Sequence, residues 1–236
     1  MPSSTTGQRA PLRVMSYNLR GLKDDKDTVA AVVRAVDPDV LLVQEAPRWP
    51  GSSYAMTAFA RECGLLWSGR QALLGQTTLL TSIRVDAKDN VDRRLKVGLR
   101  ETPRNYTMSR IRRADGLRAT VVSVHLSLLG DQRVRHITQV LAQLADDPLV
   151  VDDEPLIIGG DLNEGRDGTA WGALAQQLVE VSDDRFTFPS KDPRVRIDAI
   201  FGRGHQQVTP GDPSILDGLD LVAATDHLPV WVDLHY

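Results

Sequence analysis

The 236-residue sequence is poor in several features, and each shortage excludes a class of protein. Its single cysteine, Cys63, rules out an intrachain disulfide and leaves no set of thiolates for a structural zinc site. Because Cys63 lies near the end of a predicted helix, we interpret it as a packing residue rather than a nucleophile. No apolar run approaches the ~20 residues that a membrane-spanning helix needs. The amino-terminal residues also lack the apolar stretch of a signal peptide, so we expect a cytoplasmic protein.

Several well-known catalytic motifs are absent as well. The sequence has no GxxxxGK[ST] loop, which excludes a P-loop nucleotide hydrolase, and no HExxH motif, which disfavours a zinc protease. It also lacks the GxSxG turn of the serine hydrolases. Its formal net charge of −3 is not that of a strongly basic nucleic-acid-binding protein, although this does not exclude a local basic patch.

The length and composition that are present suit one globular domain. With 42% hydrophobic and 25% charged residues, we expect a single domain over residues 12–236 after a flexible segment at residues 1–11. Helical patterns cover residues 27–36, with Asp27 as the expected cap and Asp37-Pro38 as the stop, and residues 52–63. Short apolar strands outnumber the helices and alternate with them only in part. This pattern predicts an α/β protein in which two mixed sheets pack face to face between helices.

Polar residues follow or interrupt six of the predicted strands. These residues are Asn18, Glu45, His125, Asp161, Asn163, Asp198, Asp226 and His227. Taken singly, most of them are typical of turns and surface acids, but an aspartate within "RIDAIF" is costly to bury without a partner. If the strand ends meet at one edge of the sheets, they form one polar pocket of carboxylates, imidazoles and amides.

Such a pocket is suited to one kind of chemistry. Carboxylate oxygens are ligands for hard divalent ions such as Mg²⁺, and a histidine beside an aspartate is an oriented acid or base. Asparagine side chains can position a water or donate to developing negative charge. The combination indicates metal-assisted hydrolysis of a phosphate ester.

Six motifs in order resemble those of a known family. "SYNLRG", "LLVQEA", "SVHLS", "GGDLN", "RIDAIF" and "TDHLPV" are similar to motifs of the endonuclease/exonuclease/phosphatase superfamily, whose members share the DNase I-like fold. The resemblance extends from about residue 13 to residue 235. It implies a four-layer α/β/β/α sandwich and a metal-dependent phosphoric ester hydrolase.

The resemblance also implies roles for the residues in these motifs. Glu45 would be the principal ligand of a Mg²⁺ ion, for which Mn²⁺ could substitute. Asn18 and Asp226 would shape the metal site. Asp161 would orient or deprotonate the attacking water, which Asn163 would hold.

Two of the three remaining residues would act on the phosphate, and the third would position one of them. His227 would contact the phosphate or act as the acid–base group, and Asp198 would hold its ring. His125 would donate to a non-bridging oxygen or protonate the leaving group. Which residue is acid and which is base stays open at this point.

Three activities are possible, and we expect the first, hydrolysis of phosphodiester bonds, over the other two. The first is a nuclease-type phosphodiesterase acting on DNA or RNA, favoured by the basic "RIRR" hairpin at residues 110–113 with Arg100 and Arg104 nearby. The second is a phosphatase or phosphodiesterase for a phosphoinositide, sphingomyelin, a nucleotide or another small molecule. The third is a non-catalytic binding module. The candidate substrate contacts are Arg112, Arg166, Lys191 and Arg196. No protein partner is implied, and we expect a monomer.

Overall fold

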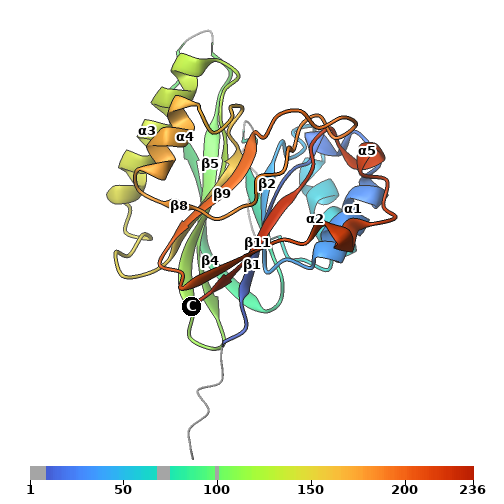
Figure 1. The fold of residues 1–236 in the computed structure, drawn as a ribbon, viewed down its shortest axis with the longest axis horizontal. Coiled ribbons are helices and arrows are strands. Elements are labelled where there is room, and N and C mark those ends of the chain that lie inside the picture. The colour runs from blue at the N-terminus through green and yellow to red at the C-terminus, as the bar shows by residue number, and fades with distance from the viewer. Residues whose placement is uncertain (1–8, 68–74, 99–100) are drawn as a thin grey trace, which may run out of the picture.

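The computed structural model describes residues 9–67, 75–98 and 101–236, and in them the predicted pair of mixed sheets is confirmed (Figure 1). The first sheet has the order β10 (Gln207–Pro210), β11 (Val230–His235), β1 (Leu12–Asn18), β2 (Val40–Gln44) and β3 (Thr78–Thr81). The second has the order β4 (Val85–Arg94), β5 (Asn105–Arg113), β6 (Arg118–His125), β7 (Leu156–Asp161), β9 (Asp198–Arg203) and β8 (Val179–Glu180). The pairs β1–β2 and β6–β7 are parallel, and the other pairs are antiparallel.

Helices cover the outer face of each sheet, which confirms the four-layer sandwich (Figure 1). α1 (Lys26–Val36), α2 (Ser52–Glu62) and α5 (Leu221–Ala224) lie on one side, and α3 (Gly130–Ala145) and α4 (Thr169–Ala175) lie on the other. Short 3₁₀ turns occur at η1 (Arg20–Leu22) and η2 (Pro213–Leu216). No helix in the described ranges is both long and apolar enough to cross a membrane.

Alternation along the strands divides the apolar side chains between three buried layers. In β1, Leu12 and Val14 face the other sheet, whereas Met15 and Tyr17 pack toward α1 and α2. This is the period-two pattern of a strand that is buried on both faces, which explains why such strands read as continuous apolar runs. The layer between the sheets is made by branched aliphatic residues of both sheets, so the two sheets are rigidly joined.

Two glycines in β7 let neighbouring strands approach closely. A Cβ at Gly159 would lie 2.7 Å from Cδ1 of Leu42 in the opposite sheet. A Cβ at Gly160 would lie 1.9 Å from the carbonyl oxygen of Val124 in β6. The "GG" before Asp161 therefore brings β2, β6 and β7 together where all three strands end.

The amino-terminal cap of α1 differs from the sequence prediction. Asp25, not Asp27, is the cap residue, and its carboxylate accepts hydrogen bonds from the backbone N–H groups of Asp27 and Thr28. Asp27 is the second residue of the helix, where its charge complements the helix dipole. The helix stops as predicted, with Asp37 in the left-handed region immediately before Pro38.

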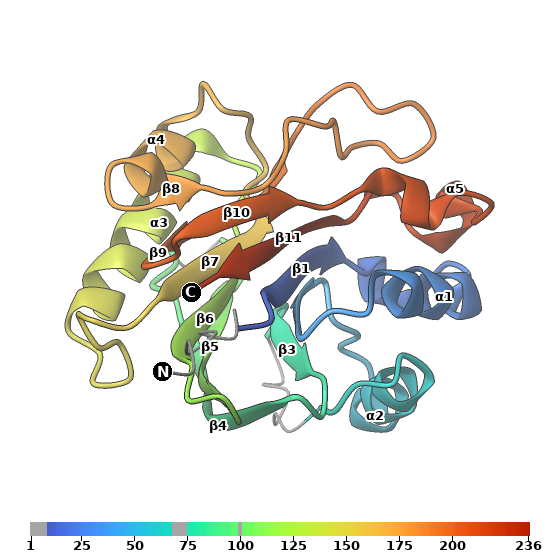
Figure 2. The same ribbon diagram turned by 60° about the horizontal axis from the view of Figure 1, so that its bottom comes forward.

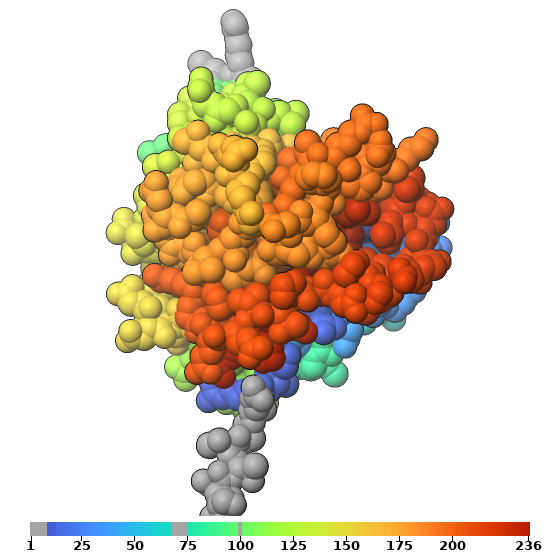
Figure 3. All heavy atoms as spheres, in the orientation of Figure 1, coloured from blue at the N-terminus to red at the C-terminus, as the bar shows by residue number. Residues whose placement is uncertain are grey.

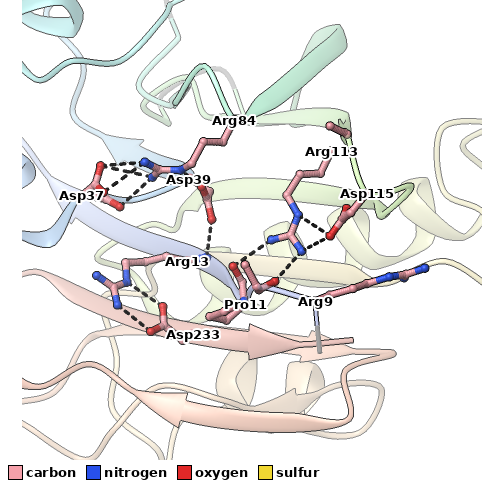
Figure 4. A pocket seen from close by; sticks show the side chains of 11 residues that line it. Arg9, Pro11, Arg13, Asp37, Asp39, Arg84, Arg113, Asp115 and Asp233 are labelled. Atoms are coloured by element: carbon pink, nitrogen blue, oxygen red, sulfur yellow. Dashed lines mark hydrogen bonds and ion pairs between the residues drawn. The ribbon is translucent and has the colours of Figure 1, made fainter. Parts of the chain in front are cut away.

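The end of the sandwich where β1 and β2 begin carries a network of ion pairs (Figure 4). It surrounds a cavity of about 790 Å³. The pairs join Arg13 to Asp233, Arg84 to Asp37 and Asp39, and Arg113 to Asp115. Arg113 also donates to the carbonyl oxygens of Ala10 and Pro11, which fastens the chain just before β1. The rest of the expected flexible segment, residues 1–8, lies outside the described residues.

Candidate active site

The predicted strand ends meet at the opposite end of the sandwich. Asn18 ends β1 and Glu45 follows β2 in the first sheet, while His125 and Asp161 are paired residues at the ends of β6 and β7 in the second. Asp198 begins β9 directly opposite Asp161. One parallel strand pair in each sheet, β1–β2 and β6–β7, thus brings its carboxyl ends to the same edge of the sandwich, where the sequence analysis expected a polar pocket.

Asp198 and His227 form a buried pair. Nδ1 of His227 lies 2.9 Å from Oδ2 of Asp198, and Phe188 packs against the imidazole with its ring centroid 4.9 Å away. The costly aspartate in "RIDAIF" therefore has a partner for Oδ2, whereas its Oδ1 is buried without a hydrogen-bond partner among the described residues. Since this pair fixes the ring through Nδ1, Nε2 of His227 is turned toward Asp161, 3.8 Å from its Oδ2.

Asp161 is the centre of the polar cluster. Its Oδ2 accepts a hydrogen bond of 3.0 Å from Nδ2 of Asn18 and lies 3.5 Å from Nε2 of His125. Its Oδ1 accepts a 2.9 Å hydrogen bond from the backbone N–H of Asn163. The side-chain oxygen of Asn18 accepts from the backbone N–H of Arg20, so its NH₂ group must face the carboxylates.

The surroundings shift the protonation of these groups in different directions. Burial, followed by the nearby negative charge of Asp198, raises the pKa of Asp161 well above its usual range. Burial is the largest single influence on His227 and disfavours its charged form. The carboxylates of Asp198, Asp161 and Asp226 together outweigh it and raise the pKa of His227 to about 9. The pKa of His125 is lowered well below 6.5, first by burial and then by the positive charge of Arg104.

Glu45 offers a carboxylate suited to a cation. It lines the cavity, is partly exposed and accepts only a long hydrogen bond of 3.4 Å from Nδ2 of Asn18 among the described residues. Asp226 borders the same cavity with its side chain 35% exposed, 3.4 Å from Nε of Arg20. Both can supply the oxygen ligands that Mg²⁺ prefers, so the predicted donors fit such an ion.

A second set of donors also lies close together. Ligand atoms of Asp161, Asp198 and His227 all lie within 4.8 Å of one another and could hold a metal. Both carboxylate oxygens of Asp161 already accept hydrogen bonds, and Oδ2 of Asp198 is paired with Nδ1 of His227. Among the described residues, Oδ1 of Asp198 is buried without a hydrogen-bond partner, so it is the oxygen of this set with free coordinating capacity.

A cavity of about 320 Å³ opens among these residues. Six lining residues were not among the predicted site residues: Arg48, Gln76, Arg104, Leu128, Phe188 and Ile197. Arg104 directly precedes β5, which is antiparallel to β6, so it lies beside the end of β6 where His125 stands. The register of the hairpin that joins β5 to β6 is the signal that could have placed Arg104 there from the sequence.

The four predicted substrate contacts lie in different places. Arg112 lies seven residues along β5 from Asn105, roughly 23 Å at about 3.3 Å per residue, so it does not reach this cavity. Lys191 is exposed and does not line the cavity either. Arg100 lies outside the described residues. The basic hairpin that favoured a nucleic-acid substrate is therefore at the other end of the sheet.

Arg166 and Arg196 border a neighbouring cavity of about 560 Å³, which shares Asn163 and Ile197 with the first. Arg196 is 7% exposed, pairs with Glu180 and stacks over the ring of Trp171 at 5.0 Å, so it holds the fold together. Arg166 pairs with Glu180 at 2.8 Å on the surface.

Comparisons with known proteins agree with this architecture. The profile of the Endonuclease/Exonuclease/phosphatase family matches residues 15–227, and comparison with curated proteins gives no match. The mannosyl-6-phosphatase Bt3783 of Bacteroides thetaiotaomicron VPI-5482 superimposes with a TM-score of 0.75 at 18% identity, covering 95% of this chain and 100% of that one. The human Nocturnin catalytic domain with bound sulfate anion gives 0.70 at 17% identity, covering 96% and 94%. Humanized D. rerio TDP2 gives 0.70 at 18% identity, covering 97% and 100%.

Proposed function

Since this chain belongs to the endonuclease/exonuclease/phosphatase family, a family of phosphoesterases, we propose that it is a divalent-metal-dependent hydrolase of small phosphate esters. The observation that carries the proposal is the convergence of Glu45, Asp161 and the Asp198–His227 pair on one cavity. These groups come from both sheets and from motifs far apart in the sequence. A binding module would not need a buried acid–imidazole pair there.

The residues of the chain divide the work of hydrolysis. Asp161, held by Asn18 and by the N–H of Asn163, is placed to accept the proton of the attacking water. His227, oriented by Asp198, presents Nε2 to the cavity, where it can stabilise negative charge on the phosphoryl group or give a proton to the leaving oxygen. Glu45 and Asp226 would hold a Mg²⁺ or Mn²⁺ ion, which supplies Lewis-acid stabilisation of the phosphate when bound.

Two observations support a small substrate over a nucleic acid. Arg112, the centre of the basic hairpin, lies away from the cavity. The arginines beside the second cavity are paired with acids, Arg166 with Glu180 and Arg194 with Asp192. Few positive charges are therefore left there to follow a phosphate backbone, which is the main source of affinity for nucleic acids.

Nuclease-type hydrolysis of DNA or RNA is the second candidate. It is favoured by the cavity of about 560 Å³ that continues from the catalytic one past Asn163 and Ile197. This space could take the part of a polymer that follows the reacting phosphate. Plasmid, single-stranded DNA and RNA therefore belong in the substrate panel.

The experiment that tests the proposal is hydrolysis of a substrate panel with Mg²⁺ or with EDTA. We expect turnover of small phosphate esters that chelator abolishes and Mg²⁺ or Mn²⁺ restores. Glu45→Gln and Asp161→Asn should each lower kcat on the order of 10²-fold or more, because each removes a group that acts at the reacting phosphate. Arg112→Gln is the matched control on the far side of the sheet. Full activity in EDTA would reject the metal, and cleavage of nucleic acid alone would favour the second candidate.

A further inference from the structure

Two arginines reach the catalytic cavity without a carboxylate partner. Arg48 lies in the loop after β2 in the first sheet, and Arg104 lies just before β5 in the second. Among the described residues neither forms an ion pair, in contrast to the arginines of the network in Figure 4, which are paired with aspartates. Two unpaired guanidinium groups facing one small cavity favour a doubly charged anion as their ligand.

Arg104 is held firmly in place. Its Nη1 donates to Oε1 of Gln76 and lies 3.1 Å from Nδ1 of His125. Within the described ranges, its buried Nε has no hydrogen-bond partner and no hydrogen bond uses its Nη2. One edge of the guanidinium is therefore fixed by protein groups, while the other has donors left for a ligand.

The contact with Arg104 also determines the state of His125. A guanidinium can only donate hydrogen bonds, so Nδ1 of His125 must accept and cannot carry a proton. The ring proton then lies on Nε2, which is 3.5 Å from Oδ2 of Asp161. His125 is thus a neutral donor aimed into the cavity from the same side as Arg104.

The donors around the cavity exceed what a phosphate diester can use. A diester has two non-bridging oxygens and one negative charge, and a metal ion, His227 and His125 suffice for them. A terminal phosphate has three non-bridging oxygens and a charge of about −1.5 to −2 at neutral pH. Arg48 and Arg104 provide donors for the additional oxygen and charge.

We propose that Arg48 and Arg104 form a two-guanidinium clamp on a terminal phosphate, which makes this site selective for phosphate monoesters over diesters. This inference rests on the proposed function, because it concerns the substrate class of the same cavity. The clamp joins the two sheets across the bound phosphate, with Arg48 contributed by one sheet and Arg104 by the other.

The test compares a monoester with a diester of the same leaving group. Arg48→Gln and Arg104→Gln are assayed with p-nitrophenyl phosphate and bis-p-nitrophenyl phosphate, beside Arg112→Gln as control. Each charge-assisted contact should be worth on the order of 10- to 100-fold in kcat/KM for the monoester. The diester should change by less than about threefold. Arg104→Lys keeps the charge without the fork and should recover part of the monoester activity.

The outcomes separate the clamp from the proposed function. Equal losses on both substrates, or no loss on the monoester, would overturn the clamp while leaving a phosphoesterase. If the unmodified protein hydrolyses neither substrate, the proposed function fails, and calorimetric binding of inorganic phosphate then decides the clamp. Binding at least tenfold weaker in the two glutamine variants would support it, and unchanged binding would overturn it.

Discussion

Two residues at the edge of the cavity have a strained backbone. Glu45 has a φ of 49° and Asn163 a φ of 53°, in the left-handed region that residues other than glycine rarely adopt. Each such conformation costs of order 1–3 kcal/mol. Since both follow strands that are fixed in the core, the strain directs their side chains into the cavity rather than along the strand.

Gly160 provides a direct test of the close approach between β6 and β7. Gly160→Ala should lower the free energy of unfolding by roughly 2–5 kcal/mol, because its Cβ would overlap the carbonyl of Val124, a backbone atom that cannot turn aside. Urea denaturation measures the change. Gly172→Ala in α4 is the matched control, since its Cβ would meet nothing and alanine favours a helix by roughly 0.5–1 kcal/mol. Equal stability of the two variants would show that the strands can move apart.

His136 gives the fold a dependence on pH that is separate from the active site. The residue is buried in α3, and neither ring nitrogen has a hydrogen-bond partner among the residues that the structure describes. Burial lowers the pKa of His136 below 6.5, so the unfolded chain binds this proton more readily than the folded one. Stability is then fully present above about pH 6.5 and is lost as the pH falls. His136→Leu should lose less stability between pH 7 and pH 5 in urea denaturation, whereas an unchanged slope would exclude His136 as a cause.

For single residues, the sequence predicted the positions of those in motifs well and the positions of those outside the motifs poorly. The six motif positions mark strand ends, and strand ends converge by topology, so Asp161, Asp198 and His227 could be placed together in advance. Arg104 and Arg112 both belong to a basic stretch, but the direction of β5 puts only Arg104 at the cavity. Composition does not reveal that difference.

Among the elements, α1 offers a clear test of its cap. Asp25→Ala should lower the free energy of unfolding by about 1 kcal/mol, because it leaves the N–H groups of Asp27 and Thr28 without an acceptor. Asp27→Ala, one of the exposed acids in the same turn, is the control and should cost only a few tenths of a kcal/mol. Urea denaturation of both variants measures the difference. A larger loss in Asp27→Ala would restore the cap that the sequence predicted.

The elements that the sequence missed are the polar ones. β4 (Val85–Arg94) has charged residues at most positions and a register shift between Lys88 and Val91, so it shows neither an apolar run nor a clean alternation. It forms because β5 provides a full hydrogen-bonding edge beside it. β8 and β10 are short edge strands of the same kind. Such pairing depends on the neighbouring strand, so the strand propensity of the segment alone does not predict it.

For the whole molecule, the division into two sheets determines which residues the site brings together. Glu45 and Asn18 belong to one sheet, and His125, Asp161 and Asp198 belong to the other. The face drawn in Figure 3 is formed mainly by the carboxyl-terminal part of the chain, in orange and red. Because its residues come from both sheets, the site lies at the junction between the sheets. Its geometry depends on the apolar layer that holds the two sheets together. The sequence predicted this layering because strands apolar on both faces need cover on both sides.

The pairing of the first strand with the last has a consequence for synthesis on the ribosome. β1 pairs with β2 on one side and with β11 on the other, and Figure 2 shows β1 in blue beside β11 in red. One edge of β1 is therefore open until residues 230–235 have emerged. At about 5–20 residues per second, this interval lasts roughly 10–45 s. During that time the nascent chain carries an unpaired apolar edge and lacks His227. The candidate active site is completed and that edge is protected at the same stage, once residues 227–235 have emerged.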